Sequence, residues 1–368
     1  MKAQHQLYQI AITFLKGIGP KKASILISRL SSVEAIFEES IHNIHKITQV
    51  PISILFQMDR NKALELAKEQ LEFITKNDIQ THFYMDGSYP RRLKQCSDAP
   101  LLLYSKGNFN RNPTKVVSIV GTRHASPYGK ELSRALVEEL KPYNIQIISG
   151  LAYGTDFNAH KAAVDLQMST VGVLGHGLDR IYPSTHSDLA KKMCENNGGL
   201  LTEFPIHTKP DRVNFPMRNR IVAGMSDALI IIESKRKGGS MITAELAFDY
   251  NRDVFAFPGS IHQENSSGCN LLIQKNMSHL ITSPADFIKL MNWQKDLVSN
   301  SSEEALPQPV AFTESENIIF KTLKNKGKMH FDQLSVDLHM SSQDLNTMLF
   351  NLELEGVVKS LPGGVYSI

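Results

Sequence analysis

The sequence predicts an α/β protein whose central part is a mostly parallel sheet with helices on both faces. Two observations lead to this prediction. Between residues 78 and 295, short apolar runs alternate with helix-length amphipathic segments, and the runs are apolar throughout rather than at every second position. Strands buried on both faces have this continuous apolar character. Right-handed crossovers between such strands would give a Rossmann-like, doubly wound domain.

The length and composition allow further domains beside this one. The chain has 368 residues, 42% hydrophobic and 21% charged, and a typical domain takes about 150 residues. Its three cysteines are far apart and form no CxxC or Cys/His ladder, which argues against disulfides and structural zinc and fits a reducing cytoplasm. No apolar run approaches the roughly 20 residues of a membrane span, so we expect no membrane partner.

Residues 1–77 form the first predicted domain, built of short helices. Between its first two helices lies the segment Leu15–Ala23, in which Gly17 and Gly19 permit a tight turn and Pro20 suits the next helix. This segment resembles a helix-hairpin-helix, a motif whose glycine turn offers amides to a DNA phosphate. With Lys21 and Lys22 alongside, it is a possible additional DNA contact; a plain packing hairpin is the alternative.

Residues 78–295 form the second predicted domain, and seven apolar runs mark its strands. The runs are Val116–Val120, Ile145–Ser149, Thr170–Leu174, Gly199–Thr202, Ala228–Ile232, Val254–Phe257 and His279–Ile281. Helices are expected between them at Tyr128–Leu140, Phe157–Leu166, Asp188–Asn196 and Thr243–Tyr250.

Residues 296–312 are rich in Ser, Pro, Glu and Asn and lack basic residues, which predicts a flexible linker. Thr313 and Glu316 have the spacing of a capping box at the start of the last domain, residues 313–368. Helices are expected there at Glu314–Asn325, Phe331–Leu338 and Ser342–Glu355, before a strand–turn–strand that ends the chain. Three helices and a two-stranded wing make a winged helix.

Loops that follow four of the predicted strands carry groups suited to an anion, and ligands of open α/β sheets bind at this edge. Glycines let backbone approach a ligand closely, hydroxyl groups hydrogen-bond, and arginine forms a two-pronged contact with phosphate. The helix that begins near Pro127 is expected to add its N-terminal amides. The candidates are Gly121, Thr122 and Arg123, then Ser149 and Gly150, then His176 and Arg180, then Gly238, Gly239, Ser240 and Thr243.

A fifth candidate loop precedes the fifth strand. Phe215, Arg218, Asn219 and Arg220 combine an aromatic ring with cations, a mixture suited to phosphates and unstacked bases. Residues 206–240 hold seven basic and three acidic side chains, the most basic stretch of the domain. Tyr182 is expected in the core. Asp156 and His160 are expected to form a buried structural pair, with an acid–base couple as the alternative.

Several catalytic motifs are missing from the sequence. It has no GxGxxG after the first strand, no GxxxxGK[ST], no clustered carboxylates and no GxSxG, which disfavours dinucleotide binding, P-loop hydrolysis, a metal nuclease and a serine hydrolase. We therefore expect no catalytic residues, no cofactor and no metal.

The motifs together resemble the DNA-processing protein A family (DprA, also called Smf) over nearly the whole chain. The resemblance rests on YPRRL at 89–93, IVGTR at 119–123, ISGLAYGTDFNAH at 148–160, VLGHGLDRIYP at 173–183, TEFP at 202–205, NFPMRNRI at 214–221, GGSMITAE at 238–245, DVFAFPG at 253–259 and SSGCNLLI at 266–273. It implies a non-catalytic, homodimeric protein that binds and protects single-stranded DNA and loads the recombinase RecA during natural transformation.

The resemblance has local departures. Family members commonly carry Arg where this chain has Tyr153, often SGS where it has Gly238–Ser240, and often Asn where Ser184, Thr185 and His186 follow Pro183. The expected winged helix also looks unsuited to DNA, because its last helix has no Lys or Arg and carries Asp344, Glu353 and Glu355. We predict a protein–protein or autoinhibitory role for that domain.

Two other functions remain open from the sequence. GGSMITAE also resembles the PGGxGTxxE motif of lysine-decarboxylase-like nucleoside-monophosphate phosphoribohydrolases, with Glu245 at their catalytic position and Met241 and Ile242 replacing the Gly-Thr pair. A scaffold for recombination proteins that touches DNA only indirectly is the other alternative. The net charges are +3 for residues 1–77, +5 for 78–295, −3 for 296–312 and −2 for 313–368, so an anionic partner would favour the first two parts.

Overall fold

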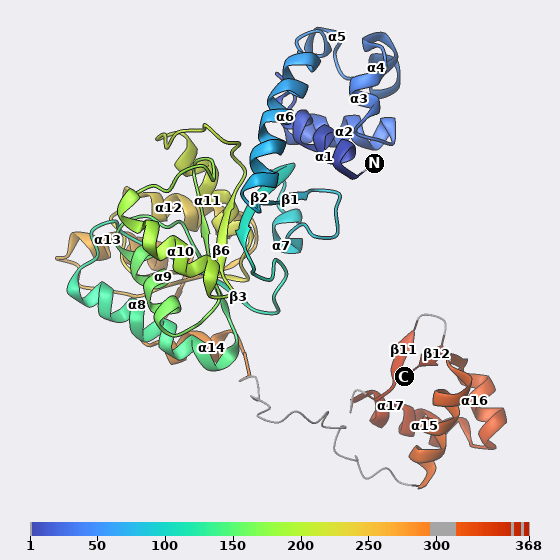
Figure 1. The fold of residues 1–368 in the computed structure, drawn as a ribbon. Helices are drawn as coiled ribbons and strands as arrows, with labels where there is room; N and C mark the ends of the chain where they lie inside the picture. The colour runs from blue at the N-terminus through green and yellow to red at the C-terminus, as the bar shows by residue number, and fades with distance from the viewer. Residues whose placement is uncertain (1, 295–313, 355–356, 362–363, 368) are drawn as a thin grey trace. The chain divides into compact units, whose positions relative to one another are not determined.

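The computed structural model describes residues 2–294, 314–354, 357–361 and 364–367 (Figure 1). The chain divides into two compact units, residues 1–296 and 297–368. The mixed α/β class, the N-terminal helices and the C-terminal winged helix that the sequence predicts are confirmed. In the described ranges, no helix combines the length and apolarity needed to cross a membrane. The predicted linker and Thr313 lie outside the described residues.

The first helices pack around an apolar core that also includes Phe83, Leu102 and Tyr104 of the sheet. They are α1 Lys2–Ala11, α2 Pro20–Leu30, α3 Ala35–Glu38, α4 Ile41–Thr48, α5 Ile52–Leu55 and α6 Arg60–Lys76, with a 3-10 turn at Ile12–Phe14. Pro20 is the first residue of α2, as its fixed φ favours. Gly17 has a φ of 79°, a left-handed conformation that favours glycine in the turn before α2. Gln70 of α6 accepts a hydrogen bond from the Ile206 amide at 2.8 Å, which ties these helices to the central sheet.

The central sheet has the strand order β1-β2-β6-β5-β4-β3-β7-β8-β9. Neighbours from β6 to β9 pair in parallel, whereas β2 pairs antiparallel with both β6 and β1. The strands are β1 Gln80–Phe83, β2 Leu102–Gly107, β3 Val116–Val120, β4 Gln146–Ser149, β5 Thr170–Val173, β6 Gly199–Thr202, β7 Ala228–Ile231, β8 Asp253–Ala256 and β9 His279–Leu280. The seven expected strands match β3–β9 closely, and β1 and β2 extend the sheet beyond them.

Helices cover both faces of this sheet (Figure 1). Val117 and Ile119 of β3 face a core formed with α8, α9 and α14, while Val116 and Val120 face one formed with α11, α12 and α13. The helices of this part are α7 Arg91–Lys94, α8 Pro127–Leu140, α9 Thr155–Asp165, α10 Ser187–Glu195, α11 Asn214–Gly224, α12 Gly239–Asp249, α13 Ser267–Gln274 and α14 Pro284–Leu290.

The segment from Phe215 to Arg220 lies inside helix α11, not in the loop that the sequence predicts. Pro216 does not oppose this helix, because it sits in the first turn, where its missing N–H has no intrahelical partner to lose. The residues of the segment therefore point to different sides of a helix, and only some of them reach the same site.

The strand order reverses direction at β3. From this strand the chain adds β4, β5 and β6 on one side and then returns to add β7, β8 and β9 on the other. The loops after β3 and β7 consequently leave the sheet toward opposite faces. Such a switch point opens a crevice at the carboxyl ends of the strands, where ligands of this fold class bind.

The C-terminal unit contains α15 Glu314–Lys326, β10 Met329–His330, α16 Phe331–Leu338, α17 Ser342–Leu354, β11 Lys359–Leu361 and β12 Val365–Ser367. Its strands form an antiparallel sheet in the order β10-β12-β11. Leu345, Leu349 and Leu352 of α17 are fully buried in its core. The domain boundaries at residues 77, 295 and 312 remain proposals.

Candidate functional site

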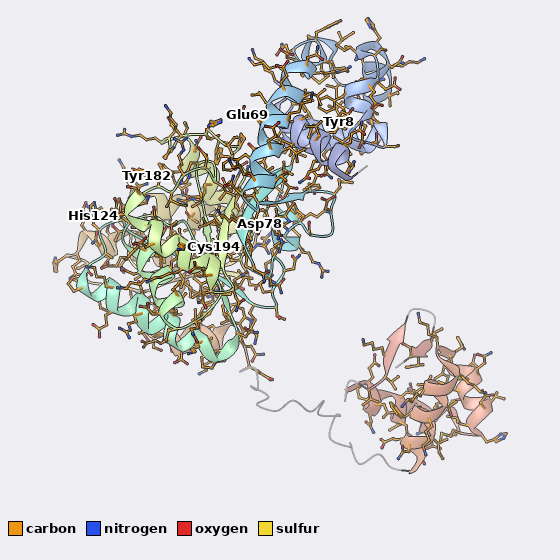
Figure 2. The ribbon with its side chains drawn as sticks, in the orientation of Figure 1. Tyr8, Glu69, Asp78, His124, Tyr182 and Cys194 are labelled. Atoms are coloured by element: carbon orange, nitrogen blue, oxygen red, sulfur yellow. The ribbon has the colours of Figure 1, made fainter. Side chains whose placement is uncertain are left out.

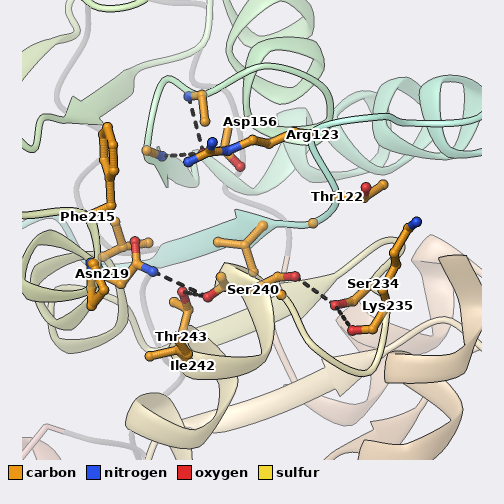
Figure 3. Close-up of a pocket in the computed structure, with 18 of the residues that line it drawn as sticks. Thr122, Arg123, Asp156, Phe215, Asn219, Ser234, Lys235, Ser240, Ile242 and Thr243 are labelled. Atoms are coloured by element: carbon orange, nitrogen blue, oxygen red, sulfur yellow. Dashed lines mark hydrogen bonds between the residues drawn. The ribbon is translucent and has the colours of Figure 1, made fainter. Parts of the chain in front are cut away.

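A cavity of about 660 Å³ lies at the switch point of the sheet (Figure 3). Its walls come from the loops after β3, β4 and β7 and from the first turns of α11 and α12. Eleven sequence-predicted residues line it: Gly121, Thr122, Arg123, Gly150, Phe215, Arg218, Asn219, Gly238, Gly239, Ser240 and Thr243. The sequence missed other lining residues, among them Arg212, Lys235, Lys237 and Ile242.

The N-terminus of α12 offers backbone amides to this cavity. Gly238 precedes the helix in an extended conformation, and in the described residues no side chain caps the amides that follow it. The Met241 amide bonds the Gly238 carbonyl at 3.1 Å, whereas no such bond occupies the amides of Gly239 and Ser240. Helix N-termini attract anions through these amides and the helix dipole. This end of the cavity is therefore built to accept a negative charge.

The hydroxyl groups around α12 hold the turn rather than pointing freely into the cavity. Ser240 Oγ lies 2.8 Å from Ser234 Oγ, and Thr243 Oγ1 donates to the Gly239 carbonyl at 3.0 Å. Asn219 Nδ2 donates to the same carbonyl at 3.2 Å. Thr243 and Asn219 thus position the glycine turn, and the amides of the turn are the groups left to bind.

Arg123 and Phe215 form the opposite wall. The Arg123 guanidinium is exposed and lies 5.4 Å from the centre of the Phe215 ring, and it forms no ion pair within the described ranges. Tyr182 also packs beside Phe215, with ring centres 6.1 Å apart. Tyr182 is 47% exposed, so the expectation that it belongs to the core is wrong. A cation and two aromatic rings stand together at this rim.

Arg218 is a buried cation behind the cavity wall, only 5% exposed. Its Nη1 donates to the carbonyls of Gly150 and Val173, and its Nε donates to Asn219 Oδ1 at 3.1 Å. Burial lowers the pKa of Arg218 to about 10, while the nearby Asp156 carboxylate acts in the opposite direction. A Cβ at residue 150 would collide with this guanidinium, which explains the glycine there.

Asp156, at the start of α9, balances that charge from the far side of the Gly150 loop. Its Oδ2 accepts hydrogen bonds from the amides of Gly150 at 3.1 Å and Ala152 at 3.3 Å. Burial raises its pKa, which Arg218 and these amides partly oppose. The Gly150 amide is therefore occupied by the protein's own carboxylate and not free for a ligand. His160 instead contacts Thr170 Oγ1 at 2.7 Å, so no Asp156–His160 couple forms.

Glu233, directly after β7, fixes both ends of the loop that carries Arg123. Its backbone carbonyl accepts the Thr122 amide at 2.8 Å. Its carboxylate accepts from the Ser126 amide at 2.9 Å and from Ser126 Oγ at 2.6 Å. The carboxylate thus occupies the N-terminus of α8, so the expectation that this helix contributes free amides is wrong.

Four predicted residues lie away from the cavity. Ser149 Oγ is buried and donates to the Ile119 carbonyl at 2.6 Å. His176 is buried, and its Nδ1 lies 2.9 Å from the Gly177 carbonyl. Arg180 pairs with Asp179 at 2.6 Å. Arg220 faces the other side of α11, where it contacts the Glu203 carboxylate and the Asp98 carbonyl.

The charge around the cavity is mainly positive. Arg123, Arg212, Arg218, Lys235 and Lys237 line it, and Asp156 is the acidic residue among its lining groups. Lys235 is shared with Glu264, whose carboxylate lies 2.7 Å from Lys235 Nζ on the exposed side. Because Asp156 is buried and Glu264 pairs with Lys235, Arg123, Arg212 and Lys237 are the cations of the rim that have no acidic partner among the residues lining the cavity.

Glu245, the position that the hydrolase motif would use, is exposed on α12 and outside the cavity lining. No group of three or more His, Cys, Asp or Glu residues able to hold a metal occurs in the part of the chain that the structure describes.

At the N-terminal hairpin, Lys22 Nζ donates to the Gly17 carbonyl at 3.1 Å, and Lys21 is exposed. Gly19 immediately precedes α2, without a side chain that caps the helix.

The doubly wound sheet carries a basic, aromatic-rimmed crevice at the carboxyl ends of its strands, the place where proteins of this class bind their ligands. Residues 80–292 match the family model of DNA recombination-mediator protein A, and residues 303–364 match the DprA winged helix domain. The chain belongs to the DNA recombination-mediator protein A family, also called DprA or Smf.

Relatives and solved structures agree with this assignment. Protein Smf of Escherichia coli is 34% identical over 282 residues, which cover 75% of this chain and 74% of that protein. The crystal structure of DNA processing protein A from Streptococcus pneumoniae superposes with a TM-score of 0.63 and 29% identity, covering 79% of this chain and 98% of the other. A structure that reports the single-stranded DNA binding mode of the Helicobacter pylori protein has a TM-score of 0.52 and 29% identity, covering 59% and 97%.

Proposed function

We propose that this chain binds single-stranded DNA in the crevice at the switch point of its sheet. The observation that carries the proposal is that an uncapped helix N-terminus, at Gly238–Ser240, and an unpaired cation beside an aromatic ring, Arg123 with Phe215, line one cavity. The amides and the guanidinium suit two phosphates, and the ring suits an unpaired base. A base inside a duplex has no free face for stacking, so the combination favours a single strand.

Family membership extends this proposal beyond the site. We propose that the protein protects the bound strand, loads it onto the recombinase RecA during natural transformation, and acts without catalysis as a homodimer in the cytoplasm. The helix-hairpin-helix turn, with Gly17, Gly19, Lys21 and Lys22, is proposed as an additional contact with the DNA backbone. The position of Glu245 gives no support to the phosphoribohydrolase alternative.

Replacing Arg123 by Ala should weaken binding of a dT oligomer about tenfold, the loss of one charge-assisted contact. The loss should be the same for other sequences, because a phosphate contact carries no sequence information. The slope of log K against log salt should become shallower by about 0.7, the value for one phosphate contact on a single strand. Fluorescence anisotropy across a salt series measures both quantities.

The matched control is Arg134→Ala, which removes an exposed arginine on α8 that pairs with Glu138 away from the cavity. It should leave affinity and salt slope close to those of the wild type. Wild-type binding by Arg123→Ala, or equal losses in the two variants, would place the DNA elsewhere on the protein.

Deleting residues 296–368 should leave affinity for the dT oligomer within about twofold of the full chain, because a helix without basic residues neutralises no phosphates. The expectation rests on helix α17, which carries Asp344 and Glu353 and no basic residue. The same anisotropy titration on the truncated and full-length proteins tests this. A loss of tenfold or more would show that the winged helix contributes to DNA binding after all.

A further inference from the structure

We infer that Tyr153 stacks on an unpaired nucleobase and so extends the binding surface past the rim of the cavity. The inference rests on the proposed binding of single-stranded DNA and names an additional side chain that recognises it. Tyr153 belongs to the loop between β4 and α9, and its ring is 47% exposed. Tyr153 is not among the residues that line the cavity. The phosphate contacts proposed for the cavity therefore leave this exposed ring without a role.

Both chain neighbours of Tyr153 are fixed at the cavity. Ala152 lines the cavity and donates its amide to Asp156. Gly154 has a φ of 77° and packs so closely on the backbone of Thr122 and Arg123 that a Cβ there would overlap it. The Thr155 amide also bonds the Thr122 carbonyl at 3.1 Å. Tyr153 is therefore held beside the loop that presents Arg123.

The ring itself rests on a rigid support. It packs edge-on against His186, with centres 5.0 Å apart and an interplanar angle of 75°. His186 is buried, its Nδ1 donates to the Leu151 carbonyl at 2.9 Å, and its ring packs on Phe157 with centres 4.5 Å apart. Thr185 Oγ1 donates to the Tyr153 hydroxyl at 3.5 Å. An aromatic ring held in place while half exposed loses little entropy when a base stacks on it.

Tyr153 also continues a set of aromatic groups at the same edge of the sheet. Phe215 lies in the cavity wall, Tyr182 packs beside it, and Tyr182 follows β5, the strand next to the one that Tyr153 follows. Figure 2 shows Tyr182 at the periphery of the central unit. A strand anchored by its phosphates at α12 and Arg123 would thus meet exposed aromatic faces along the loops after β4 and β5. Successive aromatic platforms of this kind bind single strands with little sequence preference.

The test compares a dT oligomer with an abasic oligomer of the same length, which keeps the phosphates and lacks the bases. Tyr153→Ala should weaken dT binding about tenfold, within the range for loss of one base stack. The salt slope should stay unchanged, because no phosphate contact is lost, and abasic binding should not change. Tyr153→Phe should bind like the wild type. Phe56→Ala, which removes a 61% exposed ring in the N-terminal helices, is the control and should have no effect.

A spectroscopic arm covers the case in which Tyr153→Ala fails to fold. In a Trp293→Phe background, which removes the single tryptophan of the chain, Tyr153→Trp should show fluorescence quenching with dT and none with the abasic oligomer. Wild-type dT affinity in Tyr153→Ala, equal losses on both oligomers, or a changed salt slope would overturn the inference. If Arg123→Ala still weakens binding, the proposed function survives that outcome; if the wild-type protein binds no dT, the proposed function itself fails.

Discussion

Replacing Asp156 by Ala is expected to lower the free energy of unfolding by about 3 kcal/mol, because the amides of Gly150 and Ala152 lose their acceptor and the buried Arg218 loses a nearby opposite charge. Arg218 is 5% exposed, and Asp156 is the carboxylate that favours its charged form. The same substitution removes the carboxylate oxygen that accepts hydrogen bonds from the amides of Gly150 and Ala152. Because these groups form the back wall of the cavity, DNA affinity should fall together with stability.

Urea unfolding followed by circular dichroism measures the stability, and anisotropy with a dT oligomer measures the affinity. Asp156→Asn keeps a hydrogen-bond acceptor for the two amides and removes the charge, so its stability should lie between those of the wild type and Asp156→Ala. Asp165→Ala, at the exposed end of the same helix, should be neutral. An Asp156→Ala protein as stable as the wild type would mean that Arg218 does not depend on this carboxylate.

Replacing Glu233 by Ala is expected to lower the free energy of unfolding by about 3 kcal/mol, because two half-buried donors at Ser126 lose the buried carboxylate that accepts from them. Affinity for the dT oligomer should fall about tenfold, equivalent to about 1.4 kcal/mol. The reason is positional: the carboxylate holds the far end of the loop that presents Arg123. A loop released at one end must be ordered again when it binds, and that ordering opposes association.

The two effects can be separated by the choice of variants. Ser126→Ala removes one of the two bonds to the carboxylate and should give a smaller loss of the same kind. Glu131→Ala, which removes an exposed carboxylate on α8, controls for the change in net charge and should raise affinity slightly or leave it unchanged. Undiminished affinity in a folded Glu233→Ala protein would show that the loop keeps its shape without this anchor.

The parallel strands could be predicted from the sequence because each is buried on both faces and so is apolar throughout. Strands β1 and β2 were missed. Strand β1 lacks an apolar run because it contains the polar residues Gln80, Thr81 and His82. An antiparallel strand at the edge of a sheet tolerates such residues. Helix α11 was mistaken for a loop because its Pro and consecutive polar residues resemble loop composition, and its weak amphipathicity comes from a cation, Arg218, that points inward.

The sequence predicts the residues of the candidate site that follow strands. It does not predict those whose position depends on partners far away in the sequence. Arg123 and the Gly238–Ser240 turn lie in the loops that follow β3 and β7. The general rule that ligands bind at the carboxyl ends of parallel strands therefore identifies them. That Arg218 is buried, and that Arg220 turns to Glu203, depends on which face of α11 meets the sheet. Charged residues are usually exposed, so sequence favours the opposite expectation for both. Glu233 shows no sequence signal beyond its place after a strand.

The Glu233 carboxylate at the start of α8 affects which small solutes can compete with DNA for the crevice. Small phosphorylated metabolites commonly rely on the first helix after the switch point, and here that position is already neutralised from within. A lone mononucleotide would find a single helix end and few other contacts, whereas a polymer engages the turn, the cation and the rings at once. Multiple weak attachments along one molecule reinforce each other, so we expect the crevice to select for ligand length rather than for any one nucleotide.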